Sequence, residues 1–376
     1  MHKQKTILAF IDWYRPGYKA GGTITAFGNF VDYLEKDFNF KIVTRNTDYG
    51  DDQPFSSIVS NKWIKTGNTN SYYISQSQLS SKTIKNIIKT TEYDILYVNG
   101  MFSFYFSILP IAFSKGKKTI VNPHGMLSSQ AFSVKPLKKT IFLKIFNTFK
   151  VYKNIIFHAA NTEEASMIND KIKICNAIKV ANQFPRKIKN TVAKKNILND
   201  PIRLVNVARI AQEKGTLKMI EALQNIQAEI ILDIYGPVYD QEYWEKCKNA
   251  VNKLPKHVTV NHKGFIDSEL VLEVIKGYDF FILLSEGENF GHSILEALSV
   301  GCPVIISNNT PWKDLKLKSI GWNVDINSNK EIENVFDEIF NMNEDSYKEM
   351  VKQSFIFAKN FSEDKELLNH NKNLFL

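Results

Sequence analysis

The chain has 376 residues, of which 44% are hydrophobic and 23% charged, and its formal net charge is +9 at pH 7. This length is more than one hydrophobic core usually serves, so two domains are expected. Three widely spaced cysteines, Cys175, Cys247 and Cys302, argue against a disulfide framework or a metal cluster and favour a reducing cytoplasm. The positive charge favours an anionic partner, such as a nucleotide, a nucleic acid or an anionic lipid surface.

Two apolar stretches could be mistaken for membrane segments. Residues 7–11 stop at Asp12, which is too short for a signal peptide and is typical of a first strand. Residues 101–113 are too few to span a bilayer, which needs about 20. We therefore expect a cytoplasmic protein whose membrane contact, if it has any, is peripheral on the inner face of the cell membrane.

Short apolar runs alternate with helical patterns along the whole chain, which predicts two doubly wound α/β domains. The expected domains are 1–190 and 200–360, and residues 182–201 between them have a linker-like composition. Residues 343–376 have a helical pattern. The expected strands are 6–11, 40–44, 71–74, 95–98, 118–121, 155–158, 178–180, 202–208, 230–235, 258–262, 280–284, 304–306 and 321–324.

The loop after the first strand contains the pair Gly21 and Gly22, directly before a predicted helix. Glycines at a helix start let the backbone pass close to a phosphate, although an ordinary tight turn needs a glycine too. Arg15 and Lys19 in the same loop are candidates for steering an anionic acceptor. The commoner explanation of such cations is that they are simply solvated.

His124 follows the strand at 118–121, at what would be its carboxyl edge. A lone histidine is by default a hydrogen-bonded structural residue. His158 is the competing candidate, but it lies inside an apolar run and is interpreted as structural.

Residues 131–155 contain lysines and aromatic residues but no acidic residue. A basic helix with an aromatic face can lie on an anionic membrane. The same pattern fits an ordinary helix with its aromatic face in the core and its lysines in solvent, and both interpretations remain open. A nucleic-acid surface ranks lowest, because no recognisable nucleic-acid module accompanies it. The residues concerned are Phe132, Lys135, Lys138, Lys139, Phe142, Lys144, Phe146, Phe149, Lys150, Tyr152 and Lys153.

Arg209 and Lys214 flank a predicted strand-to-helix turn at the start of the second domain. Two cations in such a turn can neutralise a diphosphate leaving group. The alternative for Lys214 is a salt bridge with a nearby carboxylate.

The most informative stretch is 285–304, another strand-to-helix turn. Gly291 allows close backbone approach, and the N–H groups of a helix start attract phosphate. Glu288 and Glu296 frame the turn, and carboxylates accept well from sugar hydroxyls. For Glu296 the competing interpretation is a capping box with Ser293 in the first helical turn.

Glu288 and Glu296, with Phe290-Gly291 between them and Glu-Ala-Leu-Ser-Val-Gly-Cys-Pro-Val at 296–304, resemble the Glu-x7-Glu signature of family 4 retaining glycosyltransferases of the GT-B fold. The similarity covers some twenty consecutive positions. His292 and Thr310-Pro311-Trp312 more weakly resemble a subgroup in bacterial surface-polysaccharide pathways.

This resemblance assigns roles to the residues of the stretch. It implies that Glu288 contacts the donor sugar and Glu296 the ribose. The backbone at Asn289, Phe290 and Gly291 would meet the diphosphate.

The resemblance also extends to other parts of the chain. Arg209 and Lys214 resemble the family's donor-phosphate pair, and Gly21 and Gly22 its glycine loop. Gly236 falls at a strand end that lines the nucleotide pocket, which makes it a donor-binding candidate. The family also places an active-site His-Gly near the position of His124.

The implied fold is GT-B, with two Rossmann-like domains, 1–190 for the acceptor and 200–360 for the nucleotide sugar, and a cleft between them. A last helix at 361–376 would cross back to the first domain. The implied reaction moves a hexose from a UDP or GDP sugar to an acceptor hydroxyl with retention. The acceptor suggested by the resemblance is a lipid-linked saccharide in surface polysaccharide biosynthesis.

No metal or cofactor is expected, because the Asp-x-Asp motif of metal-dependent transferases is absent from the sequence. Two other functions are open. One is a nucleotide-sugar epimerase of the same fold, and the other is a non-catalytic basic protein that docks on membranes.

Overall fold

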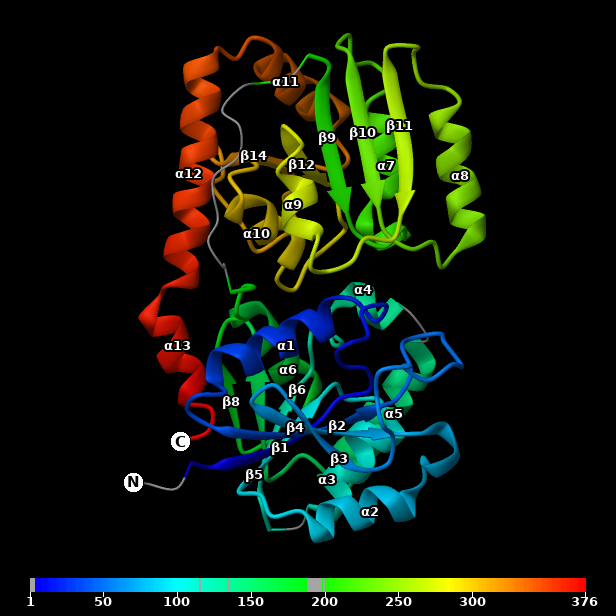
Figure 1. Cartoon of the computed structure of the whole chain (residues 1–376), viewed down its shortest axis with the longest axis vertical. Coiled ribbons are helices and arrows are strands. Elements are labelled where there is room, and N and C mark those ends of the chain that lie inside the picture. The colour runs from blue at the N-terminus through cyan, green and yellow to red at the C-terminus, as the bar shows by residue number, and fades with distance from the viewer. Residues whose placement is uncertain (1–3, 115, 134–135, 188–197, 199) are drawn as a thin grey trace. The chain divides into compact units, whose positions relative to one another are not determined.

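The computed structural model describes residues 4–114, 116–133, 136–187, 198 and 200–376. It divides into two compact units (Figure 1). Unit 1 is Met1–Phe184 together with Asp364–Leu376, and unit 2 is Pro185–Glu363. Most of the predicted linker, including 188–197, lies outside the described residues.

Unit 1 contains an eight-stranded sheet in the order β3-β4-β2-β1-β5-β6-β7-β8. All pairings are parallel except β3 with β4, which form an antiparallel hairpin at one edge. The central strands are apolar and buried, as parallel strands covered on both faces must be. The strands are β1 (Thr6–Phe10), β2 (Asn39–Arg45), β3 (Trp63–Thr66), β4 (Thr69–Ile74), β5 (Ile95–Asn99), β6 (Lys118–Asn122), β7 (Ile155–Ala159) and β8 (Ala177–Val180).

Alternate residues of the unit 1 strands enter two cores. Leu96 and Val98 of β5 belong to the cluster that packs against α2, α3, α5 and α6. Tyr97 points the other way, toward Phe27 and Phe30 of α1 and Phe375 after α13. The helices are α1 (Gly22–Leu34), α2 (Ser81–Thr90), α3 (Leu109–Phe113), α4 (Ser129–Ser133), α5 (Pro136–Thr148), α6 (Thr162–Lys171) and α13 (Lys365–Lys372), with a 3₁₀ turn η1 (Gln76–Gln78) and a π-helical turn η2 (Phe104–Ile108).

Unit 2 contains a six-stranded parallel sheet in the order β11-β10-β9-β12-β13-β14. Counted along unit 2, this is the order 3-2-1-4-5-6 of a dinucleotide-binding fold. The order reverses between β9 and β12, and ligands of such sheets bind beyond the carboxyl ends of the strands at that point. The strands are β9 (Ile202–Val207), β10 (Ile230–Tyr235), β11 (Val258–Gly264), β12 (Phe280–Leu283), β13 (Val304–Ser307) and β14 (Gly321–Val324).

Helices cover both faces of the unit 2 sheet, and β12 shows the alternation. Phe280 and Ile282 enter the core shared with α7, α8 and α11. Phe281 and Leu283 enter the core shared with α9 and α10. The helices are η3 (Gln212–Lys214), α7 (Thr216–Ala222), α8 (Gln241–Val251), α9 (Val271–Ile275), α10 (His292–Ser299), α11 (Asn329–Phe340) and α12 (Glu344–Ser362).

The predicted fold class, two doubly wound α/β units, is confirmed. The prediction missed one strand, β3, which is mostly exposed and joins β4 through the two-residue turn Gly67-Asn68. Among the described residues, no helix combines the length and the apolar character needed to cross a bilayer.

Candidate functional site

The connection from β9 to α7 carries both predicted donor-phosphate cations of unit 2. Arg209 comes directly after β9, and Lys214 ends the short turn η3. Gly215 then has φ of 68°, and a Cβ there would lie 1.8 Å from the carbonyl oxygen of Leu284. Only glycine therefore allows this connection to lie against the end of β12.

Lys214 and Glu288 meet across that contact. The distance from Lys214 Nζ to Glu288 Oε1 is 2.6 Å, and the side chains are only 22% and 10% exposed. The two residues come from the connections that follow β9 and β12, at the point where the strand order reverses. The salt bridge foreseen as an alternative for Lys214 thus exists, and its partner is the other principal candidate of the site.

Arg209 forms a separate ion pair with Glu213, at 2.8 Å from Nη2 to Oε1. Both side chains are more than a third exposed, so the pair contributes little to stability. The guanidinium remains accessible at the same loop as Lys214.

The turn between β12 and α10 is held by aromatic packing. Phe290 is buried against His292 and Trp312, and Trp312 Nε1 donates a 2.5 Å hydrogen bond to the carbonyl oxygen of Phe290. Gly291 has φ of 80° and a Cβ there would lie 2.7 Å from Ile294 Cδ1. The indole of Trp312 thus fixes the backbone that was predicted to face a diphosphate.

Glu296 lies beyond the first turn of α10, two residues further along the helix than expected. Helix α10 begins at His292 with Gly291 as its N-cap, and no side chain caps it. The capping box of Ser293 with Glu296 is therefore wrong, because the left-handed Gly291 starts the helix earlier. Placing Glu296 in the first helical turn is wrong for the same reason.

Glu296 instead pairs with Arg186, a residue that the sequence interpretation missed. Arg186 Nε lies 3.0 Å from Glu296 Oε1, and Arg186 also donates to the carbonyl oxygen of Ser268. Burial raises the pKa of Glu296, and the charge of Arg186 opposes that rise. The sequence signal was weak, because Arg186 stands in a basic stretch with a linker-like composition.

His292 is close enough to Arg186 and Lys214 for both charges to act on its imidazole. Burial first, then the charges of Arg186 and Lys214, lower the pKa of His292 to about 3. The imidazole is therefore neutral at physiological pH. Because Arg186 and Lys214 both act on His292, their ion pairs with Glu296 and Glu288 lie in the same part of unit 2.

Gly236 has a structural reason to be glycine. Its φ is 155°, and a Cβ would lie 1.9 Å from the carbonyl oxygen of Ala208. It therefore allows the ends of β10 and β9 to approach closely, whatever else it does. Its assignment to donor binding stays a prediction.

In unit 1, Gly21 and Gly22 stand at the start of α1, as predicted. Gly21 is the N-cap with φ of 76°, whereas Gly22 opens the helix without a positive φ. No heavy atom lies within 4 Å of a Cβ built at either residue. The backbone conformation therefore requires glycine at position 21 but not at position 22, and the assignment of both residues to donor binding stays a prediction.

The cations of this loop are both paired. Arg15 makes a two-pronged contact with Asp32, at 2.7 and 2.8 Å. Lys19 contacts Asp51 at 2.5 Å. Their role in acceptor binding stays a prediction, and any such anion would compete with these carboxylates.

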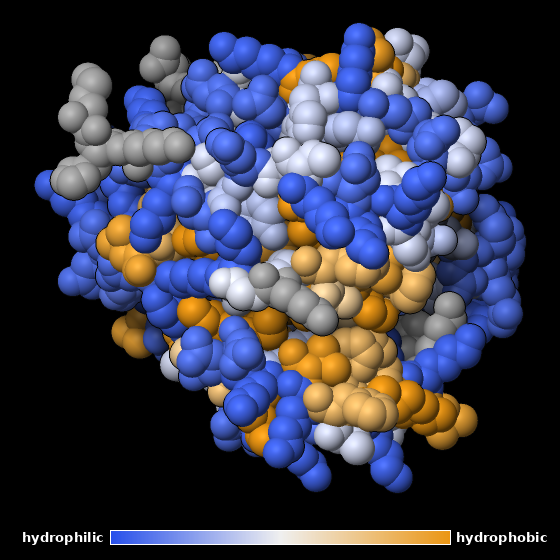
Figure 2. Space-filling view, turned by 90° about the horizontal axis from the view of Figure 1, so that it is seen from below, coloured by the Kyte–Doolittle hydropathy of each residue, from blue (hydrophilic) through white to orange (hydrophobic). Residues whose placement is uncertain are grey.

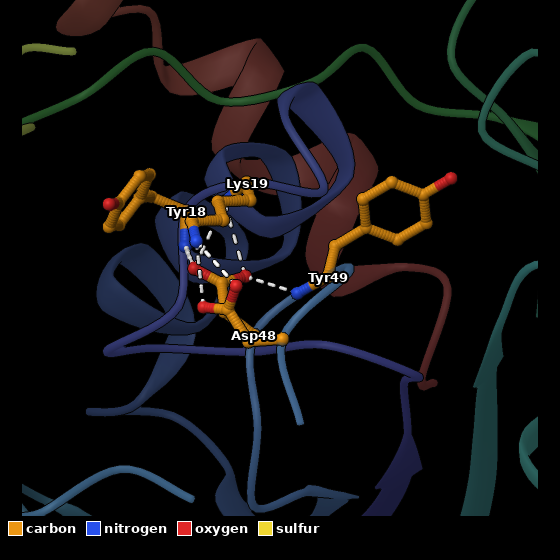
Figure 3. A network of polar contacts seen from close by, with 5 residues as sticks. Tyr18, Lys19, Asp48 and Tyr49 are labelled. Atoms are coloured by element: carbon orange, nitrogen blue, oxygen red, sulfur yellow. Dashed lines mark hydrogen bonds and ion pairs between the residues drawn. The ribbon is translucent and has the colours of Figure 1, made fainter. Parts of the chain in front are cut away.

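Asp48 ties this loop to the one that follows β2. Figure 3 shows its carboxylate accepting from the backbone N–H groups of Tyr18, Lys19 and Tyr49, while the two tyrosine rings extend away from it on opposite sides. The rings are 39% and 44% exposed. These hydrogen bonds join the two loops and hold their backbones in one arrangement.

His124 has φ of 52° and its Nε2 lies 2.8 Å from Asn99 Oδ1 at the end of β5. Beside it is a cavity of about 10 Å³, roughly one water molecule in size, that His158 and Tyr97 also line. His158 is structural, as expected, since it contacts Tyr97 and the carbonyl of Ala181. Burial lowers the pKa of His158 to about 4. His124 keeps its place at a strand end, and its catalytic role stays a prediction.

Asp12 is a second residue that the sequence interpretation missed. It follows β1, and its carboxylate contacts Ser103 Oγ at 2.9 Å and Arg45 Nη2 at 3.2 Å. Ser103 follows β5, so this group occupies the point where the strand order of unit 1 reverses. Burial raises the pKa of Asp12, while Ser103 and Arg45 oppose the rise. The signal available in the sequence was an acidic residue directly after the first strand.

No group of three or more His, Cys, Asp or Glu side chains in the described part of the chain is placed to hold a metal ion.

Comparison with known proteins identifies the family. Residues 187–355, most of unit 2, match the family described as "Glycosyl transferases group 1". The matched part of the chain is therefore a group 1 glycosyltransferase domain. This match agrees with the predicted family, which is also called family 4; the surface-polysaccharide subgroup remains a proposal.

One curated relative of this glycosyltransferase is the GtfA subunit of the UDP-N-acetylglucosamine–peptide N-acetylglucosaminyltransferase of Streptococcus gordonii. It is 26% identical over 108 residues, which are 28% of this chain and 20% of that protein. The match thus spans about a fifth of the relative's length.

Solved structures show the GT-B fold over the whole glycosyltransferase. Sucrose-phosphate synthase from Thermosynechococcus elongatus aligns over 99% of this chain and 98% of its own, with a TM-score of 0.71 at 15% identity. HepE from Anabaena, in complex with UDP and glucose, aligns over 99% and 98%, with a TM-score of 0.67 at 13% identity. At these identities the likeness establishes the fold and leaves the substrates to be argued.

Proposed function

We propose that this glycosyltransferase moves a hexose from a nucleotide diphosphate sugar to a hydroxyl group of an acceptor, with retention at the anomeric carbon. The observation that carries this is the contact of Lys214 with Glu288 at the switch point of unit 2. A cation for phosphate and a carboxylate for sugar hydroxyls are held side by side there.

Most of the donor contacts are assigned to unit 2. Arg209 and Lys214 receive the diphosphate, together with the backbone of Asn289, Phe290 and Gly291, while Glu288 accepts from hydroxyls of the hexose. The Lys214 ammonium has three N–H donors and its contact with Glu288 uses one, so it can bind phosphate without releasing the carboxylate.

Glu296 is assigned to the ribose. Its carboxylate pairs with Arg186, whose charge opposes the rise in the pKa of Glu296 that burial causes, and a carboxylate oxygen can accept from a ribose hydroxyl. Gly236 is assigned to the wall of the nucleotide pocket. In unit 1, the glycine loop at Gly21 and Gly22 is assigned to the donor phosphate, Arg15 and Lys19 to the acceptor, and His124 to the acceptor hydroxyl or donor sugar.

In the reaction, the bond between the anomeric carbon and the diphosphate oxygen breaks, and both electrons stay on the diphosphate. The acceptor oxygen bonds to the same face of the oxocarbenium-like carbon. Its proton passes to the leaving phosphate oxygen, so no protein carboxylate acts as a nucleophile. Arg209 and Lys214 accelerate the step because the negative charge they face is larger in the transition state than in the bound donor.

For the donor, UDP-hexose is favoured over a GDP sugar. HepE was solved in complex with UDP and glucose and with UDP-glucose, and the name of the GtfA enzyme contains a UDP sugar. For the acceptor we propose a lipid-linked saccharide of surface polysaccharide biosynthesis. The enzyme would then work in the cytoplasm, peripherally at the inner face of the cell membrane through residues 131–155.

A thermal-shift screen of nucleotide sugars tests the donor. A ligand that binds only the folded state stabilises it, by about 2.7 kcal/mol at a ligand concentration of 100 Kd. The melting temperature therefore rises. We expect a shift with UDP-glucose or a related UDP-hexose that is lost in Glu288→Ala. No shift with any nucleotide sugar would contradict the proposal.

The reaction is then followed by NMR with the donor that binds. Retained anomeric configuration in a glycoside product is the expected result. Release of an epimerised sugar without any acceptor would instead identify an epimerase of the same fold.

A further inference from the structure

Helix α5 of unit 1 carries apolar side chains on its outward face. Leu137, Ile141 and Ile145 are 78%, 57% and 47% exposed, and Phe149, just past the helix end, is 75% exposed. Each is four residues from the next, so they line up in one stripe. We call these four residues the α5 stripe. Figure 2, a view of one face of the molecule, shows hydrophobic side chains gathering in patches among hydrophilic ones.

The opposite face of α5 already fills the core. Leu143 is buried, and Phe142 and Phe146 pack against the core cluster of unit 1. The helix is therefore apolar on two opposite faces, which is typical of a helix covered on both sides. The aromatic residues fit the ordinary-helix interpretation, and it is the aliphatic stripe that has no cover in the described chain.

Cations border the stripe on both sides. Lys138 stands three residues before Ile141, and Lys144 three residues after it. Lys150 and Lys153 follow the helix, and all these lysines are exposed. Among the described residues, none of them is ion-paired to a carboxylate. Lys135, counted with them in the sequence, lies outside the described residues.

We propose that the α5 stripe inserts into the interface of an anionic lipid bilayer, while these lysines contact the lipid headgroups. An apolar stripe flanked by lysines is the pattern of helices that lie in the plane of a membrane. A protein partner is disfavoured, because lysine is depleted at protein–protein interfaces. The physiological use of this surface rests on the proposed function, since a lipid-linked acceptor resides at the membrane.

The test is cosedimentation of the full chain with vesicles of phosphatidylcholine alone or with phosphatidylglycerol added. We expect binding to the anionic vesicles, weakening as salt is raised, and little binding to phosphatidylcholine alone. The double variant Ile141→Ser/Ile145→Ser should lower the vesicle partition coefficient by about tenfold or more, because two buried aliphatic side chains are lost. Lys138→Glu/Lys144→Glu should also lower it by about tenfold or more, since two attractive charges near the anionic surface become repulsive.

Matched controls use exposed residues of the same type in unit 2. Leu270→Ser/Leu317→Ser removes apolar side chains that are 56% and 87% exposed. Lys253→Glu/Lys256→Glu reverses two exposed charges. Both should bind vesicles like the wild type, because a decrease as large as in the α5 variants would mean that total hydrophobicity or net charge, and not this surface, drives binding.

Three results would overturn the inference. They are equal binding to neutral and anionic vesicles, unchanged binding of the α5 variants, and a dimer without lipid that Ile141→Ser/Ile145→Ser converts to a monomer. The melting temperature of each variant and its shift with UDP-glucose are measured in parallel. Vesicle binding without any nucleotide-sugar binding would contradict the proposed function but support the membrane surface. Nucleotide-sugar binding without vesicle binding would contradict the membrane surface but support the proposed function.

Discussion

Lys214 Nζ lies 2.6 Å from Glu288 Oε1, although 73 residues separate the two in the chain and each follows a different strand. The pair exists because β9 and β12 are neighbours in the sheet and Gly215 lets their connections touch. Both partners of this mostly buried pair are also the principal candidates for donor binding.

The first prediction concerns this pair. Glu288→Gln keeps the size of the side chain but loses its charge, so transfer should fall to the background while the protein stays folded. Lys214→Ala should raise the barrier by about 2–4 kcal/mol, the scale for one lost donor to a developing oxyanion. The measurement is kcat/KM for the donor.

The matched control is Lys276→Ala, which breaks an ion pair with Glu273 that is more exposed and lies outside the proposed site. It should leave kcat/KM unchanged. Full activity of Glu288→Gln would remove Glu288 from the site.

The second prediction separates the two glycines of the first loop. Gly22→Ala places a methyl group in open space at a helical position. The free energy of unfolding should therefore stay the same or rise by up to about 1 kcal/mol, and the melting temperature should follow it. If donor phosphate approaches the backbone there, KM for the donor should rise in the same variant. Gly21→Ala should instead destabilise, because φ is 76°. An unchanged KM in Gly22→Ala would argue against the phosphate role.

The third prediction concerns packing in unit 2. Gly236→Ala should cost about 3 kcal/mol or more, because the new methyl group would overlap the carbonyl of Ala208. Gly264→Ala is a close control: its φ is also positive, at 73°, but no atom lies within 4 Å of the new Cβ. It should cost about 1 kcal/mol. Urea unfolding of both variants measures the difference, and equal losses would contradict the clash.

The fourth prediction is a loss of stability in acid. Burial lowers the pKa of His158 to about 4 and of His292 to about 3, whereas an unfolded histidine titrates near 6.5. Below pH 6.5 the unfolded chain therefore binds more protons at these two histidines than the folded chain does. The stability that the neutral histidines contribute is complete above pH 6.5 and is lost as the pH falls toward 4 for His158 and toward 3 for His292. The slope is about 1.4 kcal/mol per pH unit for each histidine.

Urea unfolding of the wild type at pH 7 and pH 5.5 measures this loss. His158→Asn, in unit 1, should flatten the dependence because the titrating group is gone. A dependence as steep as in the wild type would show that other groups cause it.

The fifth prediction is that EDTA leaves the rate of transfer unchanged. In the proposed mechanism, Arg209 and Lys214 supply the positive charge that a divalent ion supplies in metal-dependent transferases. Initial rates with EDTA and with added Mn²⁺ are compared. Strict dependence on Mn²⁺ would contradict the assignment of the cations.

The strand pattern and the two strand-to-helix turns could be predicted because each depends on residues adjacent in sequence. The edge strand β3 was missed because it is only four residues long and its side chains are mostly exposed, although the turn Gly67-Asn68 was a usable hairpin signal. The start of α10 was misplaced because Ser293 with Glu296 imitates a capping box, and the left-handed Gly291 overrides it.

The pairs of Arg186 with Glu296 and of Asp12 with Ser103 depended on the fold. In each, the partners are about 90 or more residues apart and only the three-dimensional arrangement joins them. Charge pairing across such separations leaves no local pattern in a single sequence.

Phe375 packs against Phe38, Phe40 and Tyr97, in the middle of unit 1. This unit is therefore built from both ends of the given chain, with all of Pro185–Glu363 made in between. On a ribosome, the aromatic interior of the first unit would stay open until translation had passed the second. A nascent chain halted before residue 364 should thus expose apolar surface to chaperones, even though its first 184 residues are already complete.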